Sequence, residues 1–73
     1  MKLGRYRHYK GNPYEVIGVA RHSETLEELV VYRALYISPQ FGPDSLWVRP
    51  KAMFLENVTL EGRSVPRFAP AEA

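Results

Sequence analysis

The sequence predicts an all-β protein, a small five-stranded barrel of the SH3-like or Sm-like kind with one short helical turn before the last strand. Short runs of β-branched and aromatic residues recur along the chain, which is typical of strands. Glycine and proline clusters separate these runs and predict turns. With 73 residues, the chain has room for one domain and one core.

The first two strands are predicted on either side of a tight turn. Residues 5–9 form a tyrosine-rich alternating stretch, and residues 10–13 carry the glycine and proline of a turn. Residues 14–21 are apolar on both faces, as in a strand inside a small, nearly closed sheet. Gly18 in the middle of this stretch predicts a bulge or bend.

The next segment carries two competing patterns. A capping-box sequence at residues 25–28 precedes apolar residues at helical spacing, which would suit a helix over residues 26–36. Such a helix would place Arg33 on its apolar stripe, whereas the run Val30, Val31 and Tyr32 favours a strand. We therefore expect a strand over residues 29–37, paired with residues 14–21.

The second half is predicted as short elements in quick succession. They are a loop at 38–45, a strand at 46–49 ended by Pro50, a helical turn at 51–55, a strand at 56–60, a turn at 61–63 and a final edge at 65–68. Residues 1–68 would form the single domain. Residues 69–73 have little to bury and are expected to be a disordered tail.

The alternation of these strands predicts which side chains form the core. Phe54 is the bulkiest apolar residue of the helical turn and should anchor it to the sheet. The register of strand 46–49 is open: Leu46 and Val48 face the core and expose Trp47, or the reverse holds. The expected core is Tyr6, Val16, Ile17, Val19, Val30, Tyr32, Ala34, Leu46, Val48, Phe54 and Val58.

Several strings in a fixed order resemble a small bacterial family of unknown function, DUF1653. They are GRYRHYKG at residues 4–11, YEV at 14–16, HSET at 22–25, VVYR at 30–33, LWVRP at 46–50, MFLE at 53–56 and PRF at 66–68. The resemblance covers nearly the whole chain. It implies a small barrel, often a protein in its own right, with no activity to carry over.

Composition argues against several kinds of site. The absence of cysteine excludes disulfides and thiolate metal sites, and two histidines offer little for a metal. Adjacent His22, Ser23 and Glu24 would point in different directions, so they make no catalytic triad. We expect a non-enzymatic protein without cofactor, metal or membrane partner, and a cytoplasmic location, because no apolar run could span a bilayer.

The candidate binding residues are basic and aromatic side chains near the first turn and on the fourth strand: Arg7, His8, Lys10, Trp47 and Arg49. Cations can hold phosphates and exposed rings can stack on bases, so a binding module for RNA or another anionic ligand is the leading hypothesis. The alternative is that these charged side chains are simply solvated and that the rings serve only in packing. A protein-interaction or self-assembling, homo-oligomeric module is the rival function. Glu56 is expected to pair with a nearby arginine such as Arg49.

Overall fold

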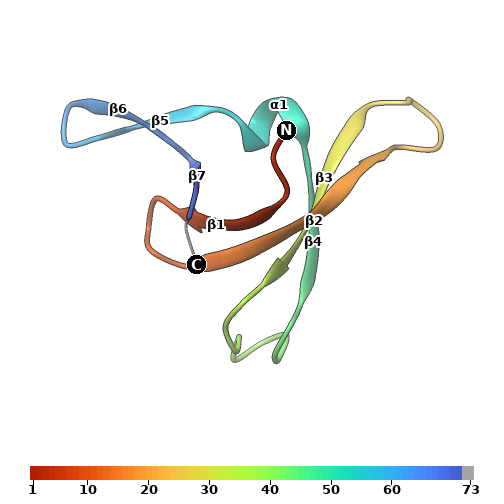
Figure 1. Ribbon diagram of the computed structural model, residues 1–73, viewed down its shortest axis with the longest axis horizontal. Coiled ribbons are helices and arrows are strands. Elements are labelled where there is room, and N and C mark those ends of the chain that lie inside the picture. The colour runs from red at the N-terminus through yellow and green to blue at the C-terminus, as the bar shows by residue number, and fades with distance from the viewer. Residues whose placement is uncertain (72–73) are drawn as a thin grey trace.

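The computed structural model describes residues 1–71, which form seven strands and one short helix (Figure 1). In chain order the elements are β1 (Gly4–His8), β2 (Pro13–Arg21), β3 (Glu28–Ala34), β4 (Leu46–Pro50), α1 (Lys51–Phe54), β5 (Asn57–Leu60), β6 (Arg63–Pro66) and β7 (Phe68–Pro70). The predicted all-β class and the short helical turn are confirmed.

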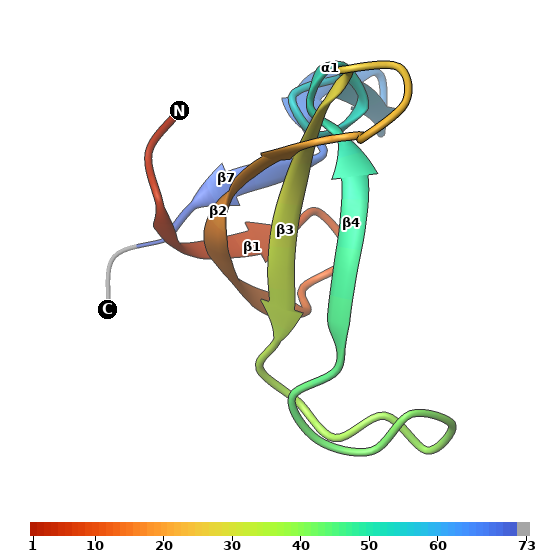
Figure 2. The ribbon, with the colours of Figure 1, turned by 90° about the vertical axis from the view of Figure 1, so that its right-hand side faces the viewer.

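Five strands form one curved antiparallel sheet in the order β4-β3-β2-β1-β7 (Figure 2). The edge strands β4 and β7 do not pair with each other, so the sheet does not close. The predicted five-stranded barrel is therefore wrong. We call the face of this sheet that carries Tyr6, Val30 and Tyr32 the inner face, and the opposite face the outer face.

The strand predicted at residues 56–60 leaves this sheet. As β5 it pairs only with β6, in a separate hairpin that Figure 1 shows projecting from the body. Glu61 and Gly62 both have positive φ, the conformation of a two-residue hairpin turn, which brings these two strands together. The fifth position in the main sheet goes to β7, so α1 precedes three strands rather than the last one.

The ambiguous segment is a strand, as expected. β3 pairs antiparallel with β2, from Tyr14 opposite Ala34 to Arg21 opposite Glu28. It ends at Ala34, three residues earlier than predicted. The register shifts between Val16 and Gly18, which confirms the predicted irregularity in β2 and leaves Ile17 as the extra residue of the bulge.

Aromatic rings fill the core between the inner face and α1. Phe54 has no exposed surface and stacks on Phe68, with ring centres 4.1 Å apart. The rings of Tyr6 and Tyr32 meet Phe54 edge-on, both at 5.5 Å. Such pairs add to the free energy of burying aromatic area, and they allow so small a chain to hold one core. Phe54 anchors the helix as predicted.

Four predicted core residues are exposed instead. The bulge turns Ile17 away from the core, and Val19, which lies beyond the bulge opposite buried Val30, is 38% exposed. On β4 the register places Trp47 opposite Tyr32, so Leu46 and Val48 point to the outer face with 63% and 60% exposure. Val58 is half-buried. Buried Phe68 was not expected in the core.

The C-terminal segment is more ordered than predicted up to its last described residue. Ala69 and Pro70 belong to β7, which pairs with β1, and the amide of Ala71 donates to the carbonyl of Arg5 at 2.9 Å. The rest of the expected tail, residues 72–73, lies outside the described residues. No helix within residues 1–71 is long and apolar enough to cross a membrane.

Candidate functional site

The site begins with His8, the last residue of β1, whose side chain lies on the inner face beside the turn. Its Nδ1 accepts a hydrogen bond from the backbone N–H of Lys10 at 3.2 Å. Gly11, with a φ of 107°, lets the chain reverse immediately afterwards, and its N–H donates to the carbonyl of His8 at 2.7 Å. The turn therefore fixes the imidazole and the following lysine relative to each other.

A series of contacts runs from β4 to this turn, with a cation at each end and three rings between them. The guanidinium carbon of Arg49 lies 5.8 Å from the centre of the Phe68 ring, and the His8 ring centre lies 4.9 Å from that of Phe68. His8 is in turn 4.6 Å from Tyr9, and the Lys10 Nζ is 5.8 Å from the Tyr9 ring centre. We call these five residues the cation–aromatic row. Three of the five predicted site residues, His8, Lys10 and Arg49, belong to it.

Positive charges surround His8. Burial lowers the pKa of His8 below its usual value of 6.5, and the positive charges of Arg49, Arg67 and Lys10 lower it further. The imidazole therefore binds a proton less readily than a free histidine does. An anion bound beside His8 would offset these positive charges and raise the pKa of the imidazole.

Arg67 is a residue that the sequence analysis did not select. Its backbone is held between Glu56 and Tyr9 by two hydrogen bonds of 2.9 Å, and its guanidinium lies 3.5 Å from the carboxylate of Glu56. Glu56 thus pairs with Arg67 rather than with Arg49 as expected. The Arg67 Nε is buried without a hydrogen-bond partner among the described residues. No local sequence signal marks it, because Arg67 comes close to His8 only when β7 pairs with β1.

Trp47 extends the inner face beyond the row, on the same side of β4 as Arg49. It is 38% exposed and meets the ring of Phe41 edge-on at 5.3 Å, while its Nε1 donates to the Ser45 Oγ at 3.0 Å. The register left open by the sequence is thus resolved. Trp47 faces inward, yet remains accessible with Phe41 at the rim.

Arg7 is a predicted site residue that lies on the other face of β1 from His8. Strand alternation places its side chain on the outer face, and its guanidinium donates to the carbonyl of Gly11 at 2.9 Å. It lines a groove of about 270 Å³ between the first turn and the β5–β6 hairpin, and His8 and Tyr9 of the row line the same groove.

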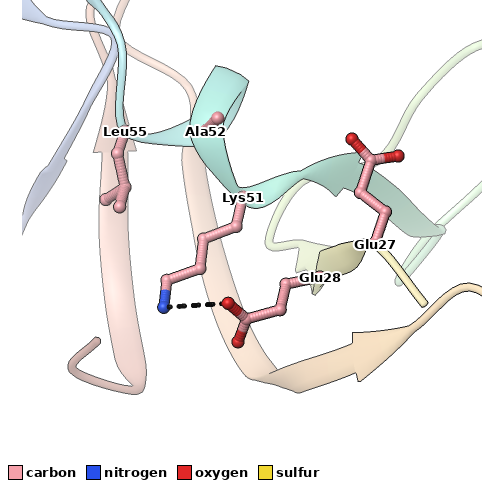
Figure 3. A pocket seen from close by; sticks show the side chains of 5 residues that line it. All are labelled: Glu27, Glu28, Lys51, Ala52 and Leu55. Carbon is pink, nitrogen blue, oxygen red and sulfur yellow. Dashed lines mark ion pairs between the residues drawn. The ribbon is translucent and has the colours of Figure 1, made fainter. Parts of the chain in front are cut away.

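A second hollow, of about 350 Å³, lies beside α1 (Figure 3). Its charged lining consists of Glu27, Glu28 and Lys51, with the Lys51 Nζ 3.8 Å from Glu28. Two carboxylates and one ammonium make it unsuited to an anion. Across residues 1–71 no three histidines or acidic residues lie together as a metal site.

Fold and surface define a small all-β protein with an open sheet, on which a cation–aromatic row runs from β4 to the turn after β1. The chain belongs to the family described as protein of unknown function (DUF1653), whose profile matches residues 4–70. A crystal structure of a member from Bordetella bronchiseptica is similar, with a TM-score of 0.87 and 37% sequence identity over 97% of this chain and 87% of that chain. The comparison with curated proteins finds no match.

Proposed function

We propose that the protein is a non-enzymatic binding module for single-stranded nucleic acid, RNA in the first place, and that it acts in the cytoplasm. The observation that carries this proposal is the cation–aromatic row. Proteins that bind single strands without sequence preference combine cations along the backbone with rings on which bases stack. Arg49 and Lys10 supply the charges, and Tyr9 and Trp47 supply rings that are not fully buried.

In this arrangement, different side chains would contact the phosphates and the bases. Arg67 and Arg49 both lie close enough to His8 to depress its pKa, so a phosphate near His8 would meet two guanidinium groups. At the rim, the contacting rings of Trp47 and Phe41 are 38% and 54% exposed. A base held there would stack while its phosphate remains in the cationic region.

The test is fluorescence anisotropy of a short labelled RNA of mixed sequence, measured over a series of salt concentrations. Each neutralised phosphate on a single strand contributes about −0.7 to the slope of log affinity against log salt. The double variant Lys10→Ala/Arg49→Gln should therefore flatten the slope by roughly 1.4. Trp47→Ala should weaken binding with little change in slope, because stacking releases no counterions.

The matched control is Arg63→Ala, which removes one positive charge from the exposed start of β6, away from the row. Its slope should remain that of the unmodified protein. Equal flattening by the control and the row variants would indicate diffuse attraction by net charge. No binding at low salt and high protein concentration would contradict the proposal outright.

A further inference from the structure

We infer that the edge strand β4 pairs with β4 of a second copy of this chain, in an antiparallel arrangement centred on Val48. The inference concerns assembly and does not depend on nucleic-acid binding. It starts from the two edges of the main sheet. Both strands end in a proline, but β7 has only three residues, and a very short edge strand offers little to pair with, whereas β4 has five residues and no acidic or lysine side chain.

The hydrogen bonding of β3 and β4 shows which backbone groups of β4 are free. The N–H of Ala34 donates to the carbonyl of Ser45 at 2.9 Å, so these two residues form a hydrogen-bonded pair. Bonded and non-bonded pairs alternate along antiparallel strands, so every second residue counted from Ser45 bonds to β3. Leu46 and Val48 lie between them and direct their N–H and C=O groups away from the sheet.

The free groups are self-complementary about Val48. Pairing two β4 strands with Val48 opposite itself makes it a hydrogen-bonded pair, with two N–H···O=C bonds across the twofold axis. On either side, the N–H of Leu46 meets the carbonyl of Pro50 in the other copy. The missing N–H of Pro50 therefore removes one donor on each side of the axis and leaves a usable acceptor.

The side chains are complementary in the same register. Trp47 of one copy lies opposite Arg49 of the other, in a non-bonded pair whose Cα atoms are only about 4.5 Å apart. A guanidinium beside an indole is a favourable cation–π arrangement. Only a twofold axis at Val48 places Trp47 of one copy directly opposite Arg49 of the other.

The outer face gives the pair an apolar surface to bury. Leu46 and Val48 are 63% and 60% exposed, and Val48 lies opposite Val31 of β3. Exposed Ile17 follows on β2, so the patch continues across three strands. Figure 2 shows β4 at the edge of the sheet with its long side open. A second β4 would extend this patch into the other copy.

The test is the molecular mass in solution, by sedimentation equilibrium from micromolar to millimolar concentrations. We expect a monomer–dimer equilibrium. Val48→Lys should abolish the dimer, because one substitution places two ammonium groups against each other on the twofold axis. Leu3→Lys, at a residue that is 52% exposed ahead of β1, is the control and should leave the equilibrium unchanged.

Two measurements on the unmodified chain keep the inference testable if Val48→Lys does not fold. The amides of Leu46 and Val48 should exchange with solvent more slowly as concentration rises, by the same factor as the monomer is depleted. The fluorescence of Trp47, the sole tryptophan, should shift to shorter wavelength over the same range. A monomer at every concentration, or a dimer with unprotected Leu46 and Val48 amides, would overturn the inference.

Discussion

Arg49 and Phe68 belong to the two edge strands of one sheet, yet the guanidinium carbon of Arg49 lies 5.8 Å from the centre of the Phe68 ring. The backbone leaves the sheet open between β4 and β7, and a side-chain contact spans the opening. This contact brings the cation of β4 to the ring that also packs against His8. The candidate site thus depends on the curvature of the sheet as much as on any single strand.

His8 should make stability depend on pH near neutrality. Its folded pKa lies below the usual 6.5, so the unfolded chain binds more protons once the pH falls below about 6.5. The contribution is therefore complete above that pH and is lost as the pH falls through the folded pKa. Thermal unfolding followed from pH 7.5 to 5.5 should show a falling midpoint.

The two histidines provide a matched pair of variants for this prediction. The Nδ1 of each accepts a hydrogen bond from the backbone N–H two residues later, from Lys10 for His8 and from Glu24 for His22. Asparagine can keep that bond without a titrating ring. His8→Asn should flatten the pH dependence and His22→Asn should not. Equal flattening by both would show that the row leaves His8 unaffected.

Phe54→Ala should destabilise the fold by about 3–5 kcal/mol, because it removes a fully buried ring at the centre of the aromatic core. Small domains have a free energy of unfolding of about 5–15 kcal/mol, so the variant should lose a large share of its stability. Met53→Ala, at the exposed neighbour on the same helix, is the control. Urea denaturation followed by circular dichroism measures both. A loss below 1 kcal/mol for Phe54→Ala would contradict the described core.

Tyr14 should ionise late in an alkaline titration of the five tyrosines. Burial raises its pKa above 10, and the hydrogen bond with the Tyr36 hydroxyl, 2.7 Å away, raises it further. Since the folded pKa exceeds the unfolded one, stability should fall as the pH rises above 10. Ultraviolet absorbance follows the phenolates directly.

Tyr36→Phe tests the contribution of that hydrogen bond. It should lower the pKa of Tyr14 toward its usual value and reduce the free energy of unfolding by about 1 kcal/mol. Tyr9→Phe changes a tyrosine with no comparable partner hydroxyl in residues 1–71 and should leave the pKa of Tyr14 unaffected. Identical titration curves for the two variants would show that burial alone sets this pKa.

Local patterns predicted the individual elements better than their assembly. The β-branched run at residues 30–32, Gly18 and Pro50 each specify local backbone, so β3, the bulge in β2 and the start of α1 were predictable. Whether the sheet closes into a barrel was not predictable, because closure depends on which strands pair with each other. The turn at Glu61 and Gly62 commits β5 to β6, and this leaves β7 to fill the sheet.

The site was predictable where residues are neighbours in sequence. His8 and Lys10 come together through one turn, and the string that contains them is visible in the sequence. Strand alternation places the Arg7 side chain on the outer face, so it shares with His8 only the groove that both residues line. Arg67 was missed because its proximity to His8 arises only when β7 pairs with β1.

Chemical-shift mapping by NMR tests the central claim most directly. A short single-stranded RNA of mixed sequence is added at low salt to the isotope-labelled protein, and the shifts of backbone amides and the His8 ring are followed. The largest changes should fall on residues 8–10, Arg49 and Trp47, and the pKa of His8 should rise as phosphate enters the cationic region. Changes confined to the α1 hollow or the outer face, with His8 unaffected, would contradict a binding surface at the cation–aromatic row.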